Sequence, residues 1–192
     1  MKQSVKFSIL AAFLVLLILV AFWGYRFLSA RYQTPEQQTA DKEHEEQAKT
    51  NTASDFTVID MDGNSVNLSD YIAKPIIINY WATCCGPCKS ELPAFDTAIQ
   101  EYGQEITFLM VNLTDGFRDT ISGVTDFVSE NNYSFPVYFD TEYSAANAYR
   151  VCSIPLTVLI DREGNLYKSH IGAMSDATLE KYIQALLEDT SQ

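Results

Sequence analysis

The sequence predicts an α/β domain in which a central mixed β-sheet is flanked by helices and preceded by a β-hairpin. Between residues 76 and 187, short apolar segments typical of buried strands alternate with segments of helical periodicity, which indicates helices on both faces of a sheet. Near residue 161, a strand–turn–strand pattern adds an antiparallel strand. The sheet is therefore expected to be mixed.

The elements can be placed in order along the chain. A hairpin is expected from 56–59 and 66–68, because Asp62-Gly63-Asn64 supplies a turn between alternating segments. Pro75 precedes residues 76–81, a nearly continuous apolar run typical of a strand buried on both faces. Further strands are expected at 106–112, 137–139, 156–160 and 166–169. Helices are expected at 85–102, 120–130, 144–149 and, capped by Ser175-Asp176, up to about residue 187.

The N-terminus predicts a membrane anchor over residues 1–30. Residues 7–25 carry no charge and would span about 28 Å as a helix, which is close to the thickness of a bilayer core. A cleaved signal peptide would have a shorter apolar region, followed by a small-x-small site that is absent here. The flanking Lys and Arg residues favour a cytoplasmic N-terminus only slightly.

A polar linker is expected at 31–54 and a globular domain at 55–192. The linker is rich in Gln, Glu and Thr and has too few aliphatic residues to fold alone. From Asp55 onward, 20 acidic and 7 basic side chains give a net charge of −13. Such an acidic domain repels phosphate backbones, so nucleic acid is not an expected partner.

Four cysteines, Cys84, Cys85, Cys88 and Cys152, carry the chemistry. Three fall within five residues, which is unlike a disulfide framework and indicates reactivity or metal binding. A zinc site is disfavoured because there is no second CxxC and no suitably placed histidine, so no metal and no cofactor besides the cysteine pair is expected.

The order strand, Cys85-Gly86-Pro87-Cys88, helix predicts a redox-active dithiol. A helix N-terminus presents unpaired N–H groups and a partial positive charge, which can lower a cysteine pKa from about 8.5 to near neutrality. Cys85 would be the exposed attacking thiol, and Cys88 would resolve the mixed disulfide.

The segments WATCCGPCKSELP and VCSIPLTVLID resemble the thioredoxin superfamily, and specifically its membrane-tethered TlpA/ResA-like branch, over residues 55–187. The resemblance implies a thioredoxin fold and thiol–disulfide oxidoreductase activity. It implies that Ile154-Pro155 is the cis-proline element beside the active-site sulfurs, and that Pro93 is the kink proline of the first active-site helix. It also implies a substrate groove formed by Trp81, Gly86, Pro87 and Ile154, with Pro155 close to the chemistry.

The same resemblance assigns a proton acceptor. Members of the branch have a glutamate three residues after the second cysteine, and Glu91 stands there, whereas Asn79 replaces the aspartate of cytoplasmic thioredoxins. Glu91 would accept the proton of Cys88 during resolution. The alternative is an ordinary glutamate on the helix surface.

Cys84 and Cys152 depart from the family pattern. Cys84 stands where relatives usually have tryptophan, and Cys152 lies three residues before Pro155. Either Cys84 is a spare, partly exposed thiol and Cys152 a small packing residue, or the two form an auxiliary pair, with each other or with the CGPC sulfurs.

The resemblance implies a domain outside the cytoplasmic membrane that reduces protein disulfides through a mixed disulfide, with electrons from a membrane partner of the CcdA/DsbD kind. Cytochrome c apoproteins and oxidatively damaged surface proteins are candidate clients. The alternatives are a redox-gated binding module and a metallochaperone, although the latter would need CxxxC and a distal histidine, and His170 is isolated. Client, electron donor, net direction and oligomeric state stay open.

Overall fold

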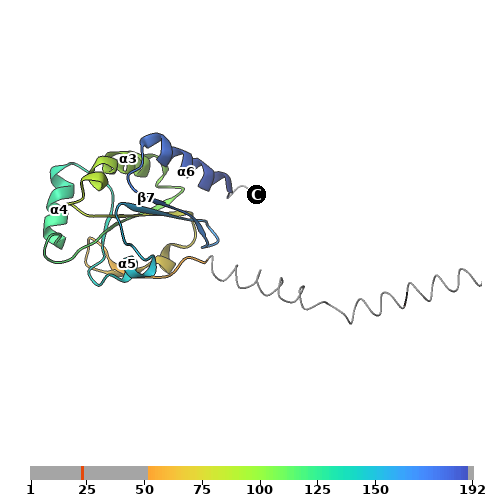
Figure 1. Ribbon diagram of the computed structural model, residues 1–192, viewed down its shortest axis with the longest axis horizontal. Coiled ribbons are helices and arrows are strands. Elements are labelled where there is room, and N and C mark those ends of the chain that lie inside the picture. The colour runs from red at the N-terminus through yellow and green to blue at the C-terminus, as the bar shows by residue number, and fades with distance from the viewer. Residues whose placement is uncertain (1–22, 24–51, 190–192) are drawn as a thin grey trace, which may run out of the picture. The chain divides into compact units, whose positions relative to one another are not determined.

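A mixed seven-stranded sheet in the order β2-β1-β5-β4-β3-β6-β7 forms the centre of the fold. The structure, a computed structural model, describes residue 23 and residues 52–189 (Figure 1). The strands are β1 Thr57–Ile59, β2 Ser65–Asn67, β3 Ile76–Trp81, β4 Thr107–Asn112, β5 Val137–Phe139, β6 Leu156–Ile160 and β7 Leu166–Ile171. Strand β3 pairs parallel with β4 and antiparallel with β6, and β6 pairs antiparallel with β7. The predicted mixed sheet and hairpin are confirmed.

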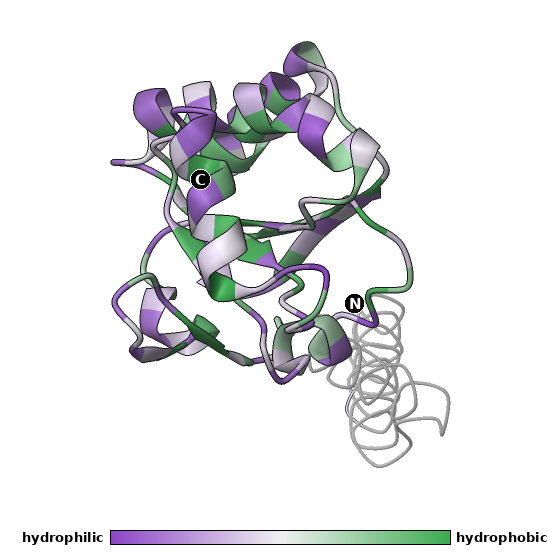
Figure 2. Ribbon diagram, turned by 90° about the vertical axis from the view of Figure 1, so that its left-hand side faces the viewer, coloured by the Kyte–Doolittle hydropathy of each residue, from purple (hydrophilic) through white to green (hydrophobic). Residues whose placement is uncertain are grey.

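Helices cover both faces of this sheet. They are the 3₁₀ helix η1 Leu68–Tyr71 and the α-helices α3 Gly86–Tyr102, α4 Ile121–Glu130, α5 Ser144–Ala148 and α6 Asp176–Asp189. Figure 1 shows α3, α4 and α6 on one side of the sheet and α5 on the other. In Figure 2 hydrophilic and hydrophobic residues alternate along the helices, as expected for helices that pack one face on a sheet.

Strand β3 contributes to two hydrophobic clusters because its side chains alternate between the two faces. Ile77 and Trp81 pack in the cluster that includes residues of α3, α4 and α6. Ile76 and Tyr80 pack in the cluster on the α5 side. All six residues of β3 are buried. The strand that leads to the redox motif is thus fixed from both sides.

The first described residues of the domain are already attached to the turn between β6 and β7. Thr52 forms a β-bridge with Asn165, and the Ala53 N–H donates to the Gly164 carbonyl at 2.8 Å. These two residues were assigned to the linker from composition alone. The predicted anchor and the rest of the linker lie outside the described residues, apart from residue 23. Within residues 23 and 52–189, no helix combines the length and hydropathy needed to cross a bilayer.

Candidate redox site

The CGPC motif lies where β3 gives way to α3. Cys85 is the N-cap residue of α3 in an extended conformation, Cys88 lies one turn inside, and the two form a disulfide with Cα atoms 5.2 Å apart. Cys85 is half-buried, whereas Cys88 has no exposed surface. The Cys88 N–H donates to the Cys85 sulfur at 3.1 Å. This N–H is one of the unpaired donors of the helix start, and it would stabilise a Cys85 thiolate after reduction.

Ile154 and Pro155 meet the redox pair from the loop before β6. The peptide bond between them is cis, and the Ile154 carbonyl oxygen lies 3.8 Å from the Cys85 sulfur. Pro155 is buried, and its own carbonyl accepts a hydrogen bond from Gly172 at 2.8 Å. The predicted contact between this element and the sulfurs is present.

Glu91 lies on α3, three residues after Cys88, and is 1% exposed, so the interpretation as a surface glutamate is wrong. The Asn79 amide donates to Glu91 Oε1 at 2.8 Å, and the Met174 N–H donates to Oε2 at 2.8 Å. Burial raises the pKa of Glu91, and the two hydrogen bonds offset part of that increase. A buried carboxylate with a raised pKa, one turn from Cys88, suits proton exchange with a thiol.

Asn79 forms a second hydrogen bond, besides the one to Glu91, that the sequence did not indicate. Its amide also donates to the Thr157 hydroxyl at 3.1 Å, which links β3, β6 and Glu91. Its Oδ1 atom is buried and has no hydrogen-bond partner among the described residues. The Asn79 amide therefore positions Glu91.

Trp81 does not line a substrate groove, contrary to the prediction. Its side chain has no exposed surface, and its ring packs against Phe127 and Phe135 with centroids 5.9 and 6.1 Å away. The alternation along β3 directs it toward α4 rather than toward solvent. Gly86 and Pro87 are exposed and Ile154 is half-buried, so three of the four predicted groove residues reach the surface at the site.

Cys84 and Cys152 are both exposed and neither forms a disulfide in this structure. Exposure fits the interpretation of Cys84 as a spare thiol. It contradicts the interpretation of Cys152 as a small packing residue. Within the described part of the chain, no group of three or more His, Cys, Asp or Glu side chains is placed to hold a metal ion.

A buried aspartate that the sequence did not indicate holds the loop before the cysteines. Asp119 is 2% exposed and accepts hydrogen bonds from Thr83 N–H at 2.8 Å, from the Thr83 hydroxyl and from the Asn112 amide at 2.7 Å. Asp119 precedes α4, so its sequence position suggests only a capping acid. The contact joins residues 36 apart, and no local pattern reveals it.

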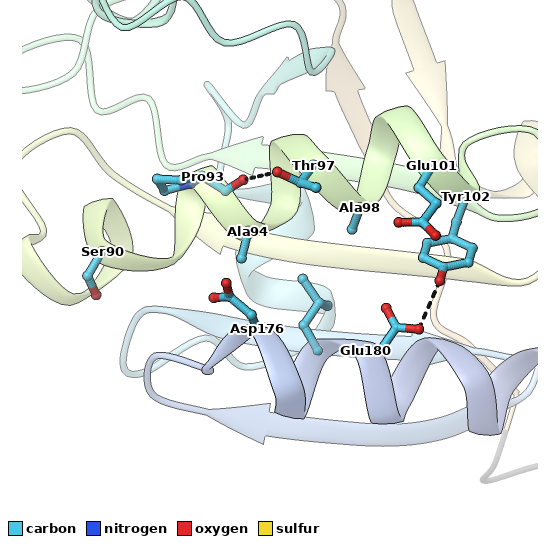
Figure 3. Close-up of a pocket in the computed structure, with 10 residues that line it drawn as sticks. Ser90, Pro93, Ala94, Thr97, Ala98, Glu101, Tyr102, Asp176 and Glu180 are labelled. Atoms are coloured by element: carbon cyan, nitrogen blue, oxygen red, sulfur yellow. Dashed lines mark hydrogen bonds between the residues drawn. The ribbon is translucent and has the colours of Figure 1, made fainter.

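Two pockets lie in this part of the domain, and only one of them is lined by a residue next to the redox cysteines. The larger, of about 230 Å³, lies between α3 and α6 and contains no cysteine. Figure 3 shows Tyr102 and Glu180 pointing toward one another across it, with a hydrogen bond of 2.8 Å. The smaller, of about 130 Å³, is lined by Cys84 and Ile154 among others. Its location makes the smaller pocket the relevant one for chemistry at Cys85.

The chain is similar to known thiol–disulfide proteins. Residues 50–169 match the AhpC/TSA family. The thiol–disulfide oxidoreductase ResA of Geobacillus kaustophilus is 29% identical over 173 residues, which cover 90% of this chain and 92% of the relative. The thioredoxin-like protein YneN of Bacillus subtilis is 28% identical over 168 residues, covering 88% and 92%. A crystal structure of an exposed lipoprotein thioredoxin of Streptococcus pneumoniae superimposes with a TM-score of 0.61 at 28% identity, covering 69% of this chain and 99% of that one. The expected thioredoxin fold and the resemblance to ResA-type proteins are confirmed.

Proposed function

Since the chain belongs to the AhpC/TSA family and is a thiol–disulfide oxidoreductase of the ResA type, we propose that it reduces disulfide bonds of other proteins through Cys85 and Cys88. The observation that carries this proposal is the Cys85–Cys88 pair at the start of α3, with the Ile154 carbonyl 3.8 Å from the Cys85 sulfur. One sulfur is accessible and the other is buried behind it. This asymmetry separates an attacking thiol from a resolving thiol.

The reaction proceeds in two exchanges. The Cys85 thiolate attacks a client disulfide, forms a mixed disulfide with one client sulfur and releases the other as a thiolate that takes a proton from water. Cys88 then gives its proton to Glu91 and attacks the Cys85 sulfur, which restores the Cys85–Cys88 disulfide and releases the second client thiolate. Two electrons pass to the client, and one disulfide is exchanged for another.

The Ile154 backbone fits a role in client binding. Its carbonyl faces the Cys85 sulfur, while the Pro155 carbonyl is occupied by Gly172. An extended client segment would donate a backbone N–H to the Ile154 carbonyl and lie across the exposed Gly86 and Pro87. This arrangement would hold the client sulfur next to Cys85.

The proposed location is outside the cytoplasmic membrane, with residues 1–30 as an uncleaved anchor and 31–51 as a tether. Disulfides form and persist in that compartment, so a reductase has substrates there. Each turnover leaves the Cys85–Cys88 pair oxidised, so the domain needs a source of electrons at the membrane. A membrane dithiol protein of the CcdA/DsbD kind is the proposed donor.

Turnover of a protein disulfide tests the proposal. The wild-type domain should catalyse reduction of insulin by a dithiol, and Cys85→Ser should abolish this catalysis because it removes the nucleophile. Cys152→Ser is the matched control, since it removes an exposed thiol outside the motif and should retain activity. Undiminished turnover by Cys85→Ser would refute the assignment. Stoichiometric binding without turnover by the wild type would indicate a redox-gated binding module instead.

A further inference from the structure

The small pocket lined by Cys84 and Ile154 combines apolar surface with one cation and two carboxylates. Ala82, Leu113 and Ile154 supply apolar surface, and Cys84, Arg118 and Tyr143 supply polar groups. Arg118, Cys84 and Tyr143 line the same pocket. Arg118 is the positively charged residue of this lining.

The pocket shares its wall with the site of disulfide exchange. Ile154 lines the pocket, and its carbonyl oxygen lies 3.8 Å from the Cys85 sulfur. Cys84, on another side, is the residue directly before Cys85. A client whose cysteine is joined to Cys85 would therefore place the side chains next to that cysteine at the mouth of this pocket.

The guanidinium of Arg118 keeps hydrogen-bond donors that are free for a ligand in this pocket. Two carboxylates line it, but both are occupied. Asp115 accepts from the Phe117, Arg118 and Asp119 N–H groups and from Arg118 Nε at 2.9 Å. Asp119 is occupied by Thr83 and Asn112. The terminal nitrogens of Arg118 have no hydrogen-bond partner among the described residues, and the side chain is 69% exposed.

We propose that this pocket is a specificity subsite that accepts a carboxylate carried by the client next to its disulfide cysteine, with Arg118 as the ligand. The proposal rests on the proposed function and names its preferred substrate class. A guanidinium with free terminal N–H groups matches a carboxylate in charge and geometry. Phe117, next to Arg118 and 89% exposed, offers apolar surface that a polypeptide would cover and a free anion would not.

The net charge of the domain opposes this preference at long range, and Asp115 and Asp119, which line the pocket, oppose it at short range. The domain carries −13 from Asp55 onward, but charges farther apart than about 8–10 Å are largely screened at 0.1–0.15 M salt. The contact with Arg118 is direct. Because that side chain is exposed, the expected preference is modest, about threefold to fivefold.

The first test needs no redox activity. In the oxidised wild-type protein Cys85 and Cys88 are blocked, so iodoacetate (anionic) and iodoacetamide (neutral) label Cys84 and Cys152. The rate of labelling by iodoacetate divided by the rate of labelling by iodoacetamide should be about threefold to fivefold higher at Cys84 than at Cys152. This excess should shrink in 1 M salt. Peptide mass spectrometry measures both sites in one sample. Equal ratios at Cys84 and Cys152 would overturn the proposal.

Three variants assign the effect to the guanidinium. Arg118→Gln should remove the excess, and Arg118→Lys should retain much of it because the charge remains. Arg162→Gln is the matched control, since it deletes an exposed arginine from the β6–β7 turn, at the opposite end of β6 from Ile154. The Arg162→Gln protein should keep the excess labelling by iodoacetate at Cys84. Loss of the excess in Arg162→Gln, or its survival in Arg118→Gln, would contradict the assignment.

The second test uses the reduced wild-type enzyme and disulfide-linked peptides that differ only in having Glu, Gln or Lys beside the cysteine. The kcat/KM should be highest for Glu and lowest for Lys, mainly through KM, and Arg118→Gln should remove the order while Arg162→Gln keeps it. Equal reduction of all three peptides by wild type would refute the subsite and leave the reductase function standing. No reduction of any peptide by the folded protein would refute the reductase function itself, and the alkylation ratios would still decide the subsite.

Discussion

Replacing Asp119 with alanine should destabilise the domain strongly, because this buried carboxylate ties the loop before the cysteines to the end of β4. The substitution removes the acceptor of three hydrogen bonds: from Thr83 N–H at 2.8 Å, from the Thr83 hydroxyl and from the Asn112 amide at 2.7 Å. At 2% exposure the carboxylate and its donors are shielded from bulk water. The donors would be left unpaired in the interior.

The expected loss follows from these contacts. Hydrogen bonds to a charged group contribute about 1.5–3 kcal/mol each, and part of this is offset because the buried carboxylate is itself costly to desolvate. Asp119→Ala should therefore lower the free energy of unfolding by about 3–5 kcal/mol. That is a large share of the stability of about 5–15 kcal/mol that is typical of a domain.

Asp119→Asn is the matched variant, because its amide can keep all three contacts. The amide oxygen would replace Oδ2, which accepts from the two N–H donors, and the amide nitrogen would donate to the Thr83 hydroxyl. Only the charge is lost, so the expected cost is about 1 kcal/mol. Urea unfolding of the oxidised proteins, fitted with a common slope, measures both losses. An alanine variant within about 1 kcal/mol of wild type, or an asparagine variant as unstable as the alanine variant, would refute the reasoning.

Three further predictions concern Glu91, the N-terminus and the free thiols. Glu91→Gln should slow turnover and change its pH–rate profile, and an unchanged profile would remove Glu91 from the mechanism. Burial raises the folded-state pKa of Glu91 above its unfolded value. The wild type should therefore lose unfolding free energy relative to this variant as the pH rises from the unfolded-state pKa to the folded-state pKa. A chain lacking residues 1–50 should be soluble and melt at a higher temperature than one lacking 1–53, which loses the Thr52 bridge and the Ala53 hydrogen bond; equal melting temperatures would show that these two contacts contribute nothing. In the Cys85→Ser/Cys88→Ser protein, mild oxidation should leave Cys84 and Cys152 as free thiols, and a disulfide between them in the mass spectrum would make them an auxiliary pair.

The sequence predicted the framework well because the relevant signals are local. Apolar runs and helical periodicity located every strand and α-helix from β1 to α6 within a few residues of its observed bounds. The redox motif was equally easy to predict from the sequence, because its strand–turn–helix setting follows from neighbouring residues. The main omissions in secondary structure are the short η1 and the last two residues of β7, His170 and Ile171, where apolar alternation is weak.

The contacts around the redox pair depend on long-range packing, and sequence patterns do not report them. The family resemblance implied that Trp81 lines the groove, yet the register of β3 turns it into the core. Asp119 was overlooked because its partner Thr83 is 36 residues away. The hydrogen bonds that Asn79 and Met174 donate to Glu91 likewise join three segments that meet only in the folded chain.

Trapping the reaction intermediate tests the division of roles between the two cysteines most directly. In Cys88→Ser the resolving thiol is absent, so incubation of the reduced protein with a disulfide-bonded client should accumulate a covalent complex. Mass mapping should place the client cysteine on Cys85, which is the accessible sulfur at the start of α3. A complex joined through Cys84 or Cys152, or a Cys88→Ser protein that turns over normally without accumulating a complex, would contradict the proposed mechanism.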